Sequence, residues 1–103
     1  MLPEVRAAMD AAAKHYVHLD ELAEAVGARL AALTGAEWGL VTAGCSAGLT
    51  HATAACVAGG NPDLHVRIPN LAGFAKDEVI IPKHSRNVYD AAVRTVGVRA
   101  PLT

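Results

Sequence analysis

Aromatic residues, cysteines and net charge are all scarce in this sequence. Aromatic side chains make up 4% of its 103 residues, and the formal net charge is −1 at pH 7. A chain so close to neutral lacks the basic surface that attracts nucleic acids or anionic membranes, so we expect neither as a partner. Its hydrophobic content of 52% excludes disorder and allows one packed domain, or part of one.

The two cysteines, Cys45 and Cys56, provide no disulfide framework. On a single predicted helix they would lie about 16 Å apart along the axis, which is too far for a disulfide. The N-terminus also lacks the basic region and apolar run of a secretory signal peptide. These absences predict a cytoplasmic, reducing location. Cys56 is separately predicted to be a core residue.

Charged residues are missing altogether from "WGLVTAGCSAGLTHATAACVAGGNP", residues 38–62. The stretch is long enough to cross a membrane, but its glycines, hydroxyl groups and His51 argue against a span, as does the lack of basic flanks. A buried strand followed by a buried helix explains the same neutrality. The five histidines of the chain show none of the spacings typical of metal sites, so we predict no metal centre.

Two helices are predicted in the first 35 residues. Pro3 suits a first helical turn, and "EVRAAMDAAAKHY" places apolar residues at helical spacing. The second helix is predicted to begin with Asp20 as its N-cap and to end at Gly35.

The remainder predicts an alternation of strands and helices. In order, we expect a strand at 37–43, a turn at Gly44, a helix at 46–58, a loop at 61–77 with a short strand at 65–68, a strand at 78–82, a helix at 88–96 and a strand from 98. Asn87 is predicted to cap the last helix, with Asp90 at the capping-box position. Alternation of this kind implies parallel pairing in an α/β fold, with helices on both faces of the sheet.

The segment "GCSAG" is the candidate functional motif. A strand that ends at Gly44 and leads directly into a helix would present the free amides of Cys45, Ser46 and Ala47 to an anion. The Ser46 hydroxyl could donate one further hydrogen bond, and Cys45 could alternatively be a reactive thiol. The motif is neither a Walker loop nor GxGxxG, and a tight turn of small residues explains it equally well. Both interpretations remain open from the residues alone.

Two segments, "LTGAE…LVTAGCSAGLTHATAAC" and "KDEVIIPKHSRNVYDAAVRTVGVR", resemble the selenocysteine synthase-like family. This family of fold-type I pyridoxal 5′-phosphate (PLP) enzymes includes L-seryl-tRNA(Sec) selenium transferase and D-glucosaminate-6-phosphate ammonia-lyase-like proteins. The resemblance extends to about Arg99. It implies the N-terminal part of an aminotransferase-like large domain, with N-terminal helices at 1–35, a cofactor-phosphate strand–helix unit at 36–60 and a second strand–helix unit at 77–103. It also implies a homo-oligomer in the full-length family.

The resemblance further implies roles for individual residues. Gly44, Cys45, Ser46 and Ala47 would cradle the cofactor phosphate. Relatives commonly read His-Arg-Asn-x-Tyr-Asp where this chain has "HSRNVYD", so either His84 or Ser85 would cover the cofactor ring. Arg86 is the preferred arginine for a substrate or phosphate group.

The family's cofactor-binding lysine lies well past the middle of its members. This chain has only Lys14, Lys76 and Lys83, and none lies in a matching motif. We therefore expect a truncated piece without catalytic residues, with weak or absent PLP binding and no turnover. The reaction it serves would be transferase or lyase chemistry on a small phosphorylated or amino-acid substrate. The alternative is a small non-catalytic binding or interaction module for a phosphorylated ligand.

Overall fold

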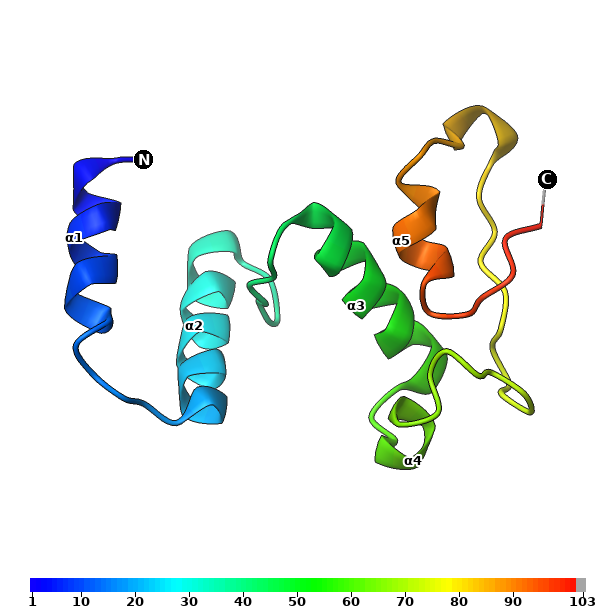
Figure 1. The fold of residues 1–103 in the computed structure, drawn as a ribbon, viewed down its shortest axis with the longest axis horizontal. Helices are drawn as coiled ribbons and strands as arrows, with labels where there is room; N and C mark the ends of the chain where they lie inside the picture. Colours follow the sequence, from blue (N-terminus) through cyan, green and yellow to red (C-terminus); the bar gives the residue numbers. More distant parts are fainter. Residues whose placement is uncertain (102–103) are drawn as a thin grey trace. The chain divides into compact units, whose positions relative to one another are not determined.

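The computed structural model describes residues 1–101, which form two compact units, residues 1–41 and 42–101. The first unit contains α1 (Pro3–Ala12) and α2 (Leu19–Thr34). The second contains α3 (Cys45–Ala58), α4 (Pro62–His65), the 3₁₀ helix η1 (Lys83–Ser85) and α5 (Asp90–Arg94), as Figure 1 shows. Among residues 1–101, no helix combines the length and the apolar character that crossing a membrane would need.

Both predicted N-terminal helices are present, with one correction at a cap. Pro3 occupies the first turn of α1, where its missing N–H costs no helical hydrogen bond. Gly35 ends α2 in the left-handed conformation (φ 74°) that favours glycine. The N-cap of α2 is His18 rather than Asp20. Asp20 instead lies in the first turn, where its negative charge complements the positive end of the helix dipole.

Two glycines bring residues 38–41 close to α2. A Cβ at Gly27 would lie 2.7 Å from the Gly39 carbonyl oxygen and from the Trp38 ring, and one at Gly39 would lie 2.4 Å from the Leu30 Cβ. Residues 37–43 make no β-bridge with any described residue, so the strand predicted there is not observed. An extended segment becomes a strand only when a second segment pairs with its N–H and C=O groups. Here contact with a helix replaces that pairing.

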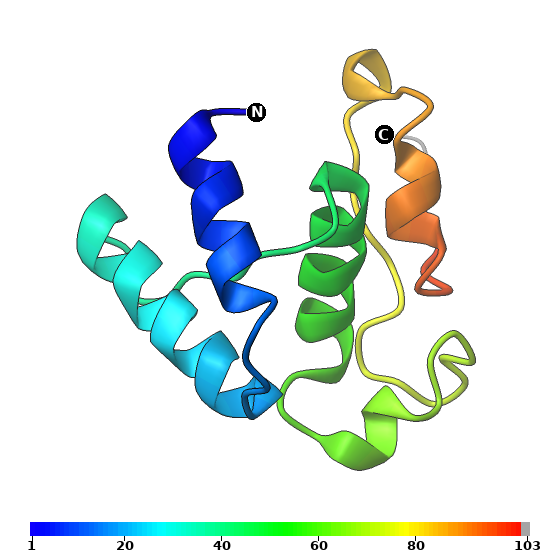
Figure 2. The ribbon, with the colours of Figure 1, turned by 60° about the vertical axis from the view of Figure 1, so that its left-hand side comes forward.

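The hydrophobic core of the second unit lies around α3. Val57, Leu71, Val96 and Val98 are buried together, and Val96 is only 1% exposed. α3 packs against α4 and α5, an arrangement that can be followed in Figure 2. Gly97 lets the backbone at residue 97 pack directly against the backbone of Pro69. Its φ is 97°, and a Cβ there would lie 2.0 Å from the Pro69 carbonyl oxygen.

Of the predicted sheet, residues 1–101 show one isolated bridge with both partners described. Glu78 and Arg99 form a parallel bridge, in which the Val79 amide donates to the Arg99 carbonyl and the Arg99 amide to the Asp77 carbonyl, both at 2.8 Å. The last two predicted strands therefore meet in the expected parallel sense. The described residues remain mainly helical, and neither the α/β sheet nor the strand–helix units at 36–60 and 77–103 are seen.

Two further elements differ from the sequence prediction. The short strand expected at 65–68 is wrong, because α4 and the turn after it occupy this region. Asn61 caps α4 by accepting a hydrogen bond from the Asp63 amide at 2.9 Å, and Pro62 follows at the first helical position. The helix predicted at 88–96 is shorter, since residues 87–89 form a turn in which Asn87 Oδ1 accepts from the Tyr89 amide at 2.8 Å.

Candidate functional site

The candidate site begins at the entry to α3. Gly44 has φ 94° and ψ 170°, and the helix starts at the next residue, Cys45. A Cβ at position 44 would meet no atom within 4 Å, so the backbone conformation, and not lack of space, requires glycine. The helix therefore starts one residue earlier than predicted and directly after the turn.

Three backbone donors are free at this helix start. Within residues 1–101, the amides of Cys45, Ser46 and Ala47 have no hydrogen-bond acceptor, and no side chain caps the helix. The first helical hydrogen bond runs from the Gly48 amide to the Gly44 carbonyl at 3.1 Å. The first turn carries no acidic residue, so no carboxylate there competes with an anion for these donors.

Thr42 fixes the direction of the first donor, a role that was not predicted from the sequence. Its Oγ1 donates to the Gly44 carbonyl at 2.9 Å, so this oxygen has two donors in all. Because C=O and N–H of one trans peptide point in opposite directions, the Cys45 amide is directed away from the helix. A hydroxyl residue two positions before a glycine was the available signal in the sequence.

The two cysteines are both exposed and free. Cys45 lies in the candidate motif. Cys56, predicted to be a core residue, instead lines a groove of about 480 Å³ between α3 and residues 75–79. The prediction was wrong because α3 has no distinct apolar face and only its C-terminal residues Val57 and Ala58 are buried. Periodicity could not identify its inner face.

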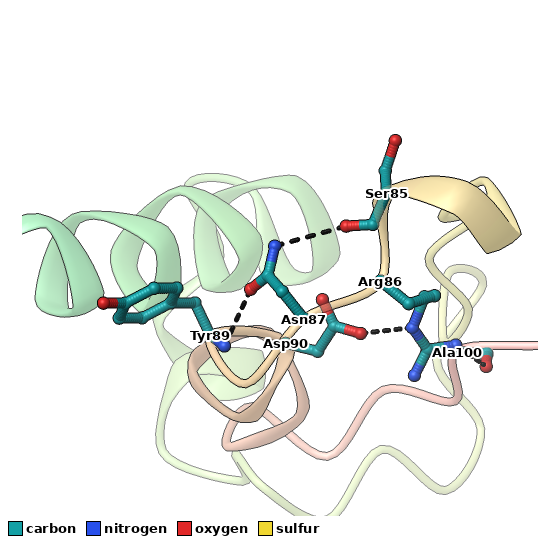
Figure 3. A network of polar contacts seen from close by, with 6 residues as sticks. All are labelled: Ser85, Arg86, Asn87, Tyr89, Asp90 and Ala100. Atoms are coloured by element: carbon teal, nitrogen blue, oxygen red, sulfur yellow. Dashed lines mark hydrogen bonds and ion pairs between the residues drawn. The ribbon is translucent and has the colours of Figure 1, made fainter.

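The second group of predicted site residues lies before α5. His84 and Ser85 are exposed in η1, and in Figure 3 the Ser85 side chain points away from the Arg86–Asp90 pair. The Arg86 Nε donates to the Asp90 carboxylate, and its Nη1 donates to the Ala100 carbonyl at 3.4 Å (Figure 3). These side chains are 21% and 9% exposed, so the ion pair is largely shielded from solvent.

Arg86 therefore has a structural partner in Asp90, and its role toward a substrate or phosphate group stays a prediction. Its hydrogen bond to the Asp90 side chain is the main reason why the pKa of that carboxyl group is lowered, and its positive charge adds to the effect. Burial opposes this change. With Nε and Nη1 engaged, the Nη2 group is the one guanidinium nitrogen of Arg86 without a partner among the described residues.

Both groups of site residues lie at one end of the second unit. Figures 1 and 2 agree in showing the start of α3, η1 and the start of α5 at this end. The Thr50 Oγ1 joins the two helices by donating to the Ala92 carbonyl at 2.9 Å in a partly buried position. This long-range link was also not predicted from the sequence, because a threonine inside an apolar helix carries no local signal for its partner.

Comparison with known proteins adds two partial similarities. The chain is 34% identical over 83 residues to D-glucosaminate-6-phosphate ammonia lyase of Salmonella typhimurium (strain 14028s / SGSC 2262), a match that covers 81% of the chain and 22% of that enzyme. It is 35% identical over 85 residues to a 5'-C-glycyluridine monooxygenase-decarboxylase of Streptomyces sp, covering 82% of the chain and 21% of that enzyme. The chain thus spans about a fifth of the length of these curated relatives. No protein-family profile and no solved structure matches it.

Proposed function

We propose that this chain supplies the cofactor-phosphate loop of a PLP-dependent enzyme of the selenocysteine synthase-like family. The observation that carries the proposal is the set of three unpaired amides, on Cys45, Ser46 and Ala47, at the start of α3. The similarity to part of an ammonia lyase supports the same conclusion and favours lyase or transferase chemistry.

The donor set suits a phosphate group. The three amides and the positive end of a 14-residue helix favour a doubly charged anion, and the Ser46 hydroxyl can add a hydrogen bond. Small side chains on both sides of Ser46 leave the backbone accessible. When bound, PLP would supply an electron sink for bond cleavage at the substrate's α-carbon. His84 or Ser85 would cover its ring, and the Nη2 of Arg86 would bind an anionic substrate group or the phosphate.

The lysines of the chain do not suit the chemical step. Lys14 follows α1, Lys76 lies in the loop before Asp77, and Lys83 is the first residue of η1 beside His84. We therefore propose that the isolated chain binds PLP weakly and turns over no amino acid. The complete protein would act as a cytoplasmic homo-oligomer on a small phosphorylated or amino-acid substrate.

A non-catalytic module for a phosphorylated ligand is the second candidate. The same three amides favour it, because they recognise phosphate and not the pyridine ring. A chain of this kind would bind inorganic phosphate and PLP equally well. A PLP-specific site would bind PLP more tightly than inorganic phosphate, and more tightly than pyridoxal, which lacks the phosphate.

Cys45→Pro tests the amide site directly. Proline is favoured at the first helical position and removes one N–H that has no helical acceptor, so the helix should be retained. A charge-assisted hydrogen bond contributes about 1.5–3 kcal/mol, so we expect PLP binding to weaken about tenfold to a hundredfold. Cys45→Ser keeps the amide and should leave the affinity unchanged.

Spectral titration of both variants with PLP and fluorescence competition with inorganic phosphate provide the measurement. Helix content by circular dichroism serves as the folding control. Equal PLP affinity in Cys45→Pro and the wild-type chain, with both folded, would contradict the proposed phosphate site. Loss of affinity in Cys45→Ser would instead indicate that the thiol is the binding group.

A further inference from the structure

The last turn of α5 contains a buried carbonyl that the helix itself leaves without a donor. The amides that follow bond to other carbonyls, Thr95 to Ala91, Val96 to Val93 and Gly97 to Arg94. Ala92 is only 6% exposed, so its oxygen requires a partner other than bulk water. The Thr50 hydroxyl provides it at 2.9 Å, across 42 positions of sequence. The same Oγ1 lies 3.2 Å from the Ser46 carbonyl in its own helix, so the single hydroxyl proton is shared between the two oxygens, with Ala92 the nearer.

Thr50 thereby connects the two groups of candidate site residues. It lies on α3, the helix whose first three amides form the proposed phosphate site. Its acceptor, Ala92, lies on α5, and the same helix begins with Asp90, which is ion-paired with Arg86. A series of direct contacts thus runs from the amide loop through Thr50 and α5 to the residues proposed to meet the cofactor ring and the substrate.

We propose that Thr50 is a positioning residue, which holds residues 44–47 and 84–86 at the separation that one PLP molecule requires. This inference rests on the proposed function. Without the hydroxyl, the Ala92 carbonyl would have to reach water, and α5 would shift away from α3 to allow it. The fraction of molecules with both groups correctly spaced would fall, and the apparent affinity for a ligand that spans them would fall with it.

Three ligands distinguish positioning from stability. With Arg86 bound to the substrate group, inorganic phosphate contacts the amide loop, pyridoxal contacts His84 or Ser85 on the ring side, and PLP contacts both. Thr50→Val keeps the shape of the side chain and removes the hydroxyl. We expect it to weaken PLP binding about threefold to tenfold, the range for one lost hydrogen bond, and to leave binding of the two smaller ligands unchanged.

Two matched variants complete the test. Thr50→Ser retains the hydroxyl and should restore PLP binding. Thr53→Val removes a hydroxyl from the same helix that donates only to its own Leu49 carbonyl, at 2.8 Å, and should change none of the three affinities. Far-UV circular dichroism and urea unfolding of each variant report folding separately from binding.

An unchanged PLP affinity in Thr50→Val overturns the inference, and so does an equal loss for all three ligands, which would indicate general destabilisation. If Thr50→Val is unfolded, the titrations are repeated in sucrose, which favours the folded chain. A variant that remains unfolded also counts against a positioning role, because the hydroxyl is then needed for folding itself. A wild-type chain that binds PLP no better than phosphate or pyridoxal overturns the proposed function together with this inference.

Discussion

Replacing Gly97 with alanine tests how closely residues 69 and 97 pack in the second unit. The change combines two penalties, because φ is 97° and the new Cβ would lie 2.0 Å from the Pro69 carbonyl oxygen. A positive φ costs a non-glycine residue about 1–2 kcal/mol, and forced overpacking typically costs about 1–3 kcal/mol. We therefore expect Gly97→Ala to lower the free energy of unfolding by about 2–5 kcal/mol.

Two other glycines separate these contributions. Gly73 has φ 79° but no atom within 4 Å of a Cβ position, so Gly73→Ala should cost only the backbone strain of about 1–2 kcal/mol. Gly60 has neither a positive φ nor a close neighbour, so Gly60→Ala should be neutral or stabilise by less than about 1 kcal/mol. All three lie in the second unit, which makes their unfolding directly comparable.

Urea unfolding followed by far-UV circular dichroism measures the three differences, with the m-value as a check on two-state behaviour. At about 0.05–0.15 kcal/mol per residue, a unit of this size has about 3–9 kcal/mol of stability, so Gly97→Ala is expected to remove a large part of it. The reasoning is refuted if Gly97→Ala loses no more stability than Gly73→Ala. In that case the close approach to Pro69 would relax without cost.

Two further predictions concern ionisation and exposure. Since pairing with Arg86 lowers the pKa of Asp90 below its ordinary value of 3.8, the pair stabilises the fold above that pH, and its contribution is lost as pH falls through the lowered pKa. Asp90→Asn should remove this part of the acid dependence in urea unfolding at a series of pH values, whereas an unchanged dependence would contradict it. Cys45 and Cys56 should both react with a water-soluble thiol reagent in the native chain, and protection of either one would contradict its exposed position.

Local sequence signals predicted the helices well and the sheet poorly. Pro3, Gly35 and Gly59 mark helix boundaries through their own backbone preferences, and the structure has boundaries at these positions. A strand depends on a partner elsewhere in the chain. A run such as 37–43 can show that a segment favours an extended conformation, but not which other segment would pair with it. The bridge between Glu78 and Arg99 is the part of the predicted pairing that the described residues do contain.

The candidate site was predictable to a similar extent. The free amides of residues 45–47 follow from a glycine turn directly before a helix, and both features can be read locally. The links made by Thr42 and Thr50 could not be read in this way. Each depends on which carbonyl a hydroxyl meets after the chain has folded, and for Thr50 that carbonyl lies 42 positions away.

The exposure of α1 has a consequence for how the chain responds to heat. None of its ten residues is buried, so tertiary packing contributes little to keeping it helical. A helix of this length is only marginally stable in water on its intrinsic propensity. α1 should therefore lose its structure gradually over a wide temperature range, and its amide protons should exchange with solvent long before those around Val96. The calorimetric transition of the chain would accordingly report unfolding of the second unit's core. The gradual loss of α1 would appear in circular dichroism as a sloping baseline of the helical signal before that transition.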